Sequence, residues 1–116
     1  MEQQRKLIIF KTYFRDFIDS LPKKVQEKIN VVLFTVTVAP RIPVKFFEHI
    51  TGPDGLYAIR VEFESNIYRI FCCFDKGNLV VLFNGFQKKS QKTPKSEIDK
   101  ALKIKEEYFK SKNLHK

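Results

Sequence analysis

The sequence predicts an α+β fold: a short N-terminal strand, a two-helix hairpin, a three-stranded antiparallel meander and a C-terminal helix. Two patterns support this prediction. Apolar residues in the first third of the chain recur at the helical period of 3.6 residues, and the middle of the chain holds apolar runs separated by short polar turns. The length of 116 residues, of which 43% are hydrophobic and 12 are Phe, fits a single domain, residues 1–116, with a compact core.

The N-terminal elements follow from periodicity and from prolines. Lys6 to Phe10 is a short apolar run of strand type. Thr12 is placed to cap a first helix with apolar positions Phe14, Phe17, Ile18 and Leu21, and Pro22 ends it. A second helix starts at about Lys23 and ends before Pro40, because the residue that precedes a proline is disfavoured in helical geometry. Its apolar face is formed by Val25, Ile29, Val32, Leu33 and Val36. We expect residues 41–55, which contain Pro43, Pro53 and two glycines, to form a connecting loop.

Residues 56–86 predict the meander, and the two turns predict its register. With Ser65 and Asn66 as the first turn, Phe63 faces Tyr68, Arg60 faces Phe71, and one face of the hairpin is wholly apolar or aromatic. With Lys76 and Gly77 as the second turn, Phe74 faces Leu79. This register places Leu79, Val81 and Phe83 on the same apolar face, toward the two helices. A slip of one residue would turn every side chain to the other face.

The opposite face of the predicted meander is divided in two. Its apolar end holds Phe71, Cys73, Val80 and Leu82, and its polar end holds Arg60, Arg69, Asn84 and Lys88. The C-terminal helix is predicted to start at Thr93 as N-cap, with Pro94 in the first turn, and to cover the apolar end. Its apolar stripe is Ile98, Ala101, Leu102, Lys105, Tyr108 and Phe109. We expect the tail, residues 111–116, to fray.

Charge and cysteine content limit the kinds of partner, cofactor and cellular compartment that the sequence predicts. The formal net charge is +9, and residues 86–116 contribute ten lysines against four acidic residues, which favours an anionic partner. The adjacent Cys72 and Cys73 point to opposite faces of a strand, so we interpret them as small buried hydrophobic residues of a reducing compartment. No cluster has metal-ligand spacing, and we expect neither a metal nor a cofactor. Without a signal peptide or an apolar run of membrane-spanning length, we expect a cytoplasmic protein that does not bind a membrane.

The convergence of Arg60, Arg69 and Lys88 is the strongest chemical signal in the chain. An arginine inside a sheet must pair or bind an anion, and guanidinium matches the oxygens of a phosphate. Cleavage of RNA by its own 2′-hydroxyl requires a base, cations on the phosphate and an acid. A lysine crowded by other cations has a lowered pKa and can act as the base. The alternative is that the arginines pair with Glu62 and Glu64 and that the lysines form a solvated patch.

Three segments resemble the RelE/ParE superfamily of toxins from type II toxin–antitoxin modules, and within it the HigB-like, phage-derived branch. They are residues 55–60 (GLYAIR), 68–71 (YRIF) and 85–101, with Phe86, Lys88, Lys89, Thr93 and Pro94 as the most specific positions. The likeness extends from Lys6 to Phe109. It implies a metal-independent, ribosome-dependent endoribonuclease (an mRNA interferase) that inhibits translation. It also implies a cognate antitoxin, a small helix-turn-helix or partly disordered protein, beside the mRNA and the ribosome as partners.

The resemblance implies roles for single residues. Arg60 and Arg69 would bind the scissile phosphate and stabilise the transition state, while Lys88 and Lys89 would bind RNA, one of them as base or acid. Lys92 and His49 are further candidates for RNA or phosphate binding.

The chain departs from the family pattern in two respects. A glutamate usual two residues before the first arginine is Ala58 here. Tyr108 and His115 lie where some relatives carry a catalytic Tyr or His, but Tyr108 belongs to a helix stripe that favours packing. Two alternative functions remain, namely inhibition of DNA gyrase as in ParE-like relatives and a catalytically inactive binding module of prophage origin.

Overall fold

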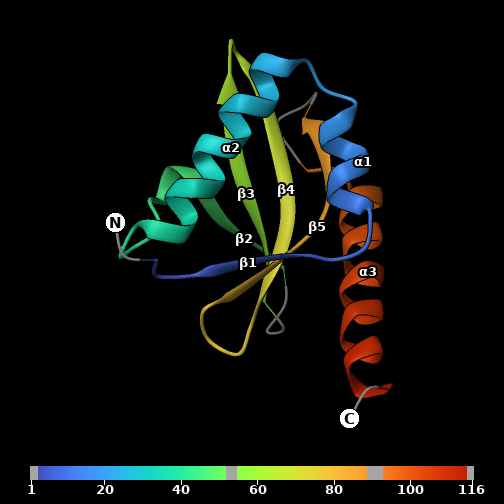
Figure 1. The fold of residues 1–116 in the computed structure, drawn as a ribbon. Helices are drawn as coiled ribbons and strands as arrows, with labels where there is room; N and C mark the ends of the chain where they lie inside the picture. Colours follow the sequence, from blue (N-terminus) through green and yellow to red (C-terminus); the bar gives the residue numbers. More distant parts are fainter. Residues whose placement is uncertain (1–2, 52–54, 89–92, 115–116) are drawn as a thin grey trace.

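A computed structural model describes residues 3–51, 55–88 and 93–114. Figure 1 shows an open sheet with helices packed against it. In chain order the elements are β1 (Lys6–Ile9), α1 (Tyr13–Asp19), α2 (Lys23–Val38), the 3₁₀ turn η1 (Val44–Phe46), β2 (Phe47–Thr51), β3 (Leu56–Phe63), β4 (Asn66–Asp75), β5 (Leu79–Lys88) and α3 (Lys95–Leu114).

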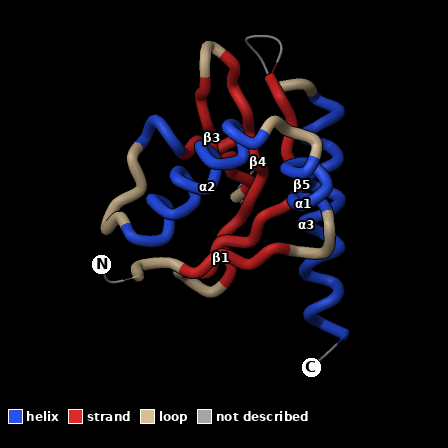
Figure 2. The backbone as a smooth tube through the Cα atoms, turned by 45° about the horizontal axis from the view of Figure 1, so that its top comes forward, coloured by secondary structure: helices blue, strands red, loops and turns tan. Residues whose placement is uncertain are grey.

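The sheet has five strands in the order β1-β5-β4-β3-β2, and this confirms the predicted α+β class. Figure 2 shows the part of the sheet formed by β1, β5, β4 and β3. The N-terminal strand pairs in parallel with β5, whereas all other neighbours are antiparallel. The predicted loop over residues 41–55 was wrong in part, because it contains η1 and the edge strand β2. With five residues, β2 is too short to show a clear alternating pattern in the sequence.

The helices α1 and α2 cover one face of the sheet. The five residues predicted for the apolar face of α2 are the five that are buried there: Val25, Ile29, Val32, Leu33 and Val36. They pack with Phe14 of α1 and with the inward side chains of β3 and β4. Thr12 precedes α1 as predicted, but its side chain accepts no capping hydrogen bond from the helix backbone. Its hydroxyl instead donates to the Asp16 carboxylate at 3.1 Å.

The helix α3 covers the other face of the sheet, as predicted. It starts later than predicted, and its buried stripe differs from the predicted stripe by one position. It begins at Lys95 rather than after Thr93, and the carbonyl of Pro94 accepts the first helical hydrogen bonds. Ile104 is buried where the predicted stripe had Leu102, which is exposed. The buried hydroxyl of Tyr108 donates to the Asp75 carboxylate at 2.6 Å, and Lys112 pairs with the same carboxylate at 2.5 Å. These contacts fasten α3 to the β4–β5 turn.

The first hairpin keeps its predicted faces in a shifted register. Glu64 and Ser65, both with positive φ, form the turn, so Phe63 pairs with Asn66 rather than with Tyr68. One strand is displaced by two residues, and an even shift leaves each side chain on its expected face. The shift has one consequence for the polar end, since Arg60 is paired directly with Arg69.

The second hairpin departs from its predicted register at two points, and the two departures offset each other. Its loop has three residues, 76–78, rather than two, so Asp75 pairs with Leu79. The side chains that face α1 and α2 are therefore Val80 and Leu82, and the predicted Val81 and Phe83 lie on the opposite face. Between the pairs Cys72–Leu82 and Ile70–Gly85 the register shifts by one residue on β5. This β-bulge turns the strand back, and Phe86 and Lys88 therefore lie on the side of Arg69, as predicted.

The bulge depends on Gly85, which faces the ring of Phe17 on α1. A Cβ at position 85 would lie 2.4 Å from Cδ2 of Phe17. We therefore expect Gly85→Ala to lower the free energy of unfolding by about 1–3 kcal/mol, the usual cost of overpacking, in urea denaturation. In a Phe17→Ala background the same substitution should cost much less. An equal cost in both backgrounds would show that Phe17 is not the constraint.

Candidate functional site

The candidate site lies at the polar end of the face that α3 leaves uncovered. Arg60 on β3 and Arg69 on β4 are cross-strand partners, so their side chains project to the same side of the sheet. Their exposure differs. The side chain of Arg60 is 30% exposed, whereas that of Arg69 is 6% exposed. Arg60 is thus available to a ligand, and Arg69 lies beneath the surface.

Both arginines are paired with carboxylates. Nη2 of Arg60 lies 3.3 Å from Oε2 of Glu62, as the alternative interpretation of the sequence expected. Nη1 of Arg69 pairs with Oε1 of Glu48 on β2, rather than with Glu64. Burial lowers the pKa of the Arg69 guanidinium, but an arginine remains protonated at neutral pH. The site therefore holds a buried cation with its own counter-ion.

Glu48 is a functional candidate that the sequence did not reveal. It is the cross-strand partner of Ala58 and lies on the same face as Arg60 and Arg69. The family pattern described above has a glutamate at the position of Ala58, two residues before the first arginine. In this chain Glu48 of β2, the cross-strand partner of Ala58, supplies a carboxylate beside that position. Only recognition of β2 as a strand would have brought Glu48 to this place.

Lys88 is the third member of the cluster. It is half-buried at the end of β5, where it pairs with Ile67 and lies on the side of Arg69. Its pKa is lowered by burial and by the positive charges of Arg69 and Arg60. The three predicted catalytic residues are therefore close enough to influence one another, and the lysine has an increased neutral fraction.

Polar atoms without partners accompany the cluster. Within the described ranges, Nε of Arg69 and both side-chain polar atoms of the buried Asn84 accept or donate no hydrogen bond. Asn84 lies in the bulge of β5, two residues before Phe86. The sequence placed it at the polar end of this face without giving it a role. Buried amides of this kind are rare because they forgo their hydrogen bonds.

Among the other residues singled out in the sequence, His49 and Tyr108 are not brought to this cluster. His49 lies on β2 rather than in a loop, paired with Tyr57, and its ring packs edge-on against the Tyr57 ring at 5.3 Å. Alternation along β2 directs it to the face opposite Glu48. Lys89 and Lys92 lie outside the described residues, as does His115. Tyr108 packs in the core beneath α3, as its position in the helix stripe predicted.

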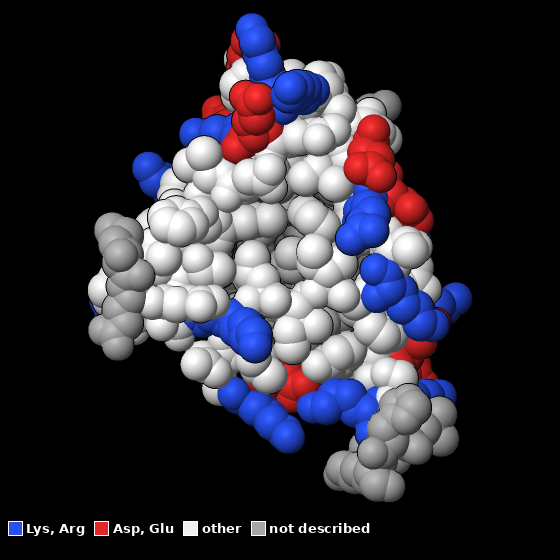
Figure 3. All heavy atoms as spheres, in the orientation of Figure 1, with Lys and Arg blue, Asp and Glu red and all other residues white. Residues whose placement is uncertain are grey.

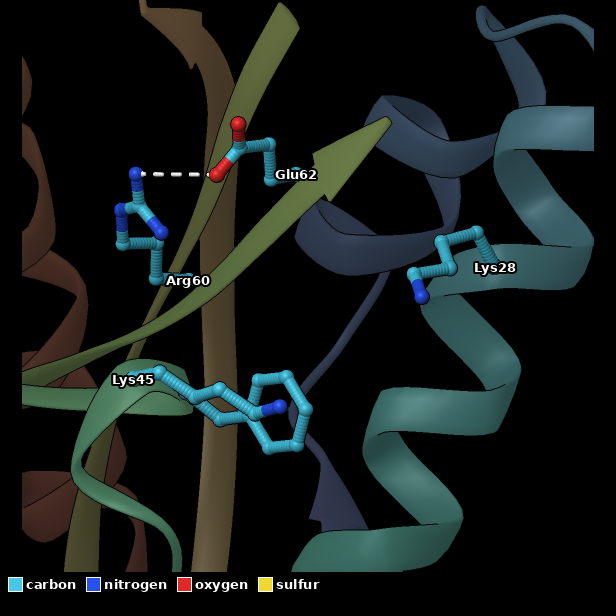
Figure 4. Close-up of a pocket in the computed structure, with 5 residues that line it drawn as sticks. Lys28, Lys45, Arg60 and Glu62 are labelled. Atoms are coloured by element: carbon cyan, nitrogen blue, oxygen red, sulfur yellow. Dashed lines mark hydrogen bonds and ion pairs between the residues drawn. The ribbon is translucent and has the colours of Figure 1, made fainter. Parts of the chain in front are cut away.

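A pocket adjoins Arg60 at the free edge of β3. It has a volume of about 240 Å³ and is lined by Lys28, Lys45, Phe46, Arg60 and Glu62. Figure 4 shows Lys28 reaching from α2 and Lys45 from η1 toward each other, with Arg60 and Glu62 on the β3 side. Basic side chains also surround the periphery of the face seen in Figure 3, whose centre is mostly uncharged. Neither lysine was singled out in the sequence.

Other chemistries find little support in the described part of the chain. There, no three His, Cys, Asp or Glu side chains gather as metal ligands would. Cys72 and Cys73 are free, buried and on opposite faces, and burial raises the pKa of Cys73 to about 11. Thiols of this kind are unreactive packing groups. None of the described helices is long and apolar enough to cross a membrane.

Comparison with protein-family models gives a match over most of the chain. The model of the family described as "Phage derived protein Gp49-like (DUF891)" matches residues 16–106, which include Arg60, Arg69, Lys88 and the bulge between them. No curated protein matches the chain.

The Arg69–Glu48 pair yields a stability prediction. Because Arg69 is buried and Glu48 is partly exposed, Glu48→Ala should lower the free energy of unfolding by about 1–3 kcal/mol in urea denaturation, between the values for exposed and for fully buried pairs. Glu62→Ala is the matched control and should cost about 0–1 kcal/mol, as exposed pairs do. Equal small losses would show that the buried guanidinium needs no carboxylate.

The lowered pKa of Lys88 can be measured directly by NMR titration of its side chain. Removing a neighbouring positive charge stabilises the ammonium form, so Arg60→Gln should raise the pKa of Lys88 toward its ordinary value. Arg15→Gln, a change at an exposed residue of α1, should leave it unchanged. A Lys88 pKa that does not respond to Arg60→Gln would contradict the proximity of the three cations.

Proposed function

Because the chain belongs to the Gp49-like family of phage-derived proteins, a group of toxin–antitoxin toxins, we propose that it is the toxin of a type II module that cleaves mRNA on the ribosome. The observation that carries the proposal is the convergence of Arg60, Arg69 and Lys88 from three adjacent strands, with a lowered pKa at the lysine. A protein that acts by binding alone has no need to gather three cations at one place on the sheet.

The chemistry assigns a different task to each cation. Neutral Lys88 takes the proton of the 2′-hydroxyl, whose oxygen attacks the adjacent phosphorus. The bond from phosphorus to the 5′-oxygen breaks, this oxygen takes a proton from water, and a 2′,3′-cyclic phosphate remains. Arg60, the exposed arginine, binds the phosphate oxygens as negative charge develops on them. Arg69 is too buried to contact the RNA, so it acts as a positioning residue that lowers the pKa of Lys88.

The carboxylates beside the arginines are compatible with these tasks. The Arg60–Glu62 pair is solvent-exposed and long, at 3.3 Å, and such pairs contribute only about 0–1 kcal/mol. A phosphodiester that offers two oxygens to the guanidinium can displace Glu62 at little cost. Glu48 instead stays with Arg69, because separating that pair would leave a buried charge uncompensated.

The proposed antitoxin is an acidic protein, since the chain carries a net charge of +9. We considered the apolar end of the sheet, together with the last helix, as a docking surface for this partner. In the structure α3 already covers that end of the sheet.

The test is 5′-end mapping of mRNA in a purified translation reaction. The wild-type protein should generate new ends within codons. Arg60→Gln should lower the cleavage rate about 10²–10³-fold, and Lys88→Gln about 10²–10⁴-fold. The charge-matched controls Arg15→Gln and Lys100→Gln should retain full activity. Intact mRNA together with inhibited DNA gyrase would replace the nuclease with the ParE-like function.

A further inference from the structure

The pocket beside Arg60 exists because β2 is shorter than β3. The last residue of β3 that pairs with β2 is Ile59, opposite Phe47, so the segment from Arg60 to Phe63 has no strand on that side. The edge left open is flanked by η1 and by α2, whose side chains complete the walls of the pocket. Arg60 therefore belongs both to the cation cluster on the sheet and to this separate cavity.

The charge in the pocket is unbalanced. Arg60 and Glu62 pair with each other, which leaves the ammonium groups of Lys28 and Lys45 without a carboxylate among the described residues. Lys28 is half-buried, and a half-buried cation without a counter-ion gains from binding an anion. The Nζ of Lys45 lies 4.9 Å from the centre of the Phe46 ring, so the second cation rests against an aromatic wall.

This combination suits a single-stranded nucleic acid better than a simple anion. Cations that follow the phosphates and aromatic rings that accept bases are the two elements of such sites. We propose that the pocket is a nucleotide subsite of the RNA-binding surface, in which Lys28 and Lys45 bind the phosphate next to the one held by Arg60 and Lys88. In this subsite the base packs on Phe46 after Lys45 moves from the ring to the phosphate.

The proposal rests on the proposed function, because it extends the RNA path from the scissile phosphate around the free edge of β3 to α2. It makes Arg60 the link between two consecutive phosphates. A docked acidic protein segment is the competing occupant of the same pocket. The aromatic wall at Phe46 favours a nucleotide, because a carboxylate gains little from it.

The experiment measures binding of 2′-O-methyl RNA, which lacks the attacking hydroxyl and so separates binding from cleavage. Fluorescence anisotropy is recorded over a range of salt concentrations for the wild-type protein and for Lys28→Gln/Lys45→Gln. With a hexanucleotide, loss of the one phosphate that Lys28 and Lys45 neutralise should reduce the slope of log K against log[salt] by about 0.7. Phe46→Leu should weaken binding about fivefold or more while leaving the slope unchanged.

Two controls isolate the pocket. Lys100→Gln/Lys103→Gln on the exposed side of α3 removes the same charge and should leave the slope unchanged. A dinucleotide with a single phosphate should bind the wild-type protein and the Lys28/Lys45 double variant equally, because its phosphate goes to Arg60 and Lys88. Circular dichroism of each variant confirms that it is folded.

The outcomes separate the subsite from the function. One outcome is that the wild-type protein cleaves mRNA but the Lys28/Lys45 double variant and the Lys100/Lys103 control have the same salt slope for hexanucleotide binding. This outcome would overturn the subsite and leave the proposed nuclease function intact. Absence of both mRNA cleavage and hexanucleotide binding would overturn the proposed function and the subsite together. If only binding of a poly-glutamate peptide is weakened in the double variant, the pocket holds an acidic protein segment and the RNA assignment is wrong.

Discussion

The β-bulge in β5 is the constraint on which the candidate site depends. Without the extra residue between Leu82 and Gly85, the three-residue loop of the β4–β5 hairpin would direct Lys88 to the face covered by α1 and α2. The bulge returns the end of the strand to the side of Arg69, and Gly85 lets the backbone approach the ring of Phe17 closely. Bulges are used in this way near functional sites, where they aim a side chain.

Bringing the side chains of Arg60, Arg69 and Lys88 together costs electrostatic free energy because their charges repel. Glu48 and Glu62 reduce this repulsion to different extents. Glu48 pairs with the buried Arg69, so the structure retains a fixed positive charge at a depth where an unpaired one would be destabilising. Glu62 pairs with the more exposed Arg60 and can give way to a ligand. Lys88 pairs with neither of these carboxylates, and its pKa is lowered by burial and by the positive charges of Arg69 and Arg60. In the proposed mechanism this shift falls on the residue that acts as the base.

The sequence predicted elements with many periodic residues well and strand register poorly. The face of α2 was predicted residue by residue because five buried positions share one period. Register depends on loop length, and a loop of two or three residues cannot be distinguished from Lys76-Gly77-Asn78 alone. The predicted position of Lys88 was correct only because the longer loop and the bulge offset each other. Glu48 and Lys28 were missed because their roles depend on a short strand and on the packing of α2 beside the sheet edge.

The uneven lengths of β2 and β3 give the two halves of the basic surface different properties. Where β2 continues, it supplies Glu48 and neutralises Arg69 within the sheet. Where β2 is absent, the edge of β3 stays open, and Lys28 of α2 and Lys45 of η1 lie around it with no ion pair to a carboxylate in the described part of the chain. The lysines at the open edge of β3 are therefore placed to attract a polyanion over a distance, whereas the buried charge of Arg69 is already compensated by Glu48. This separation allows binding strength to change with salt while the pKa of the lysine, set at short range within the sheet, changes little.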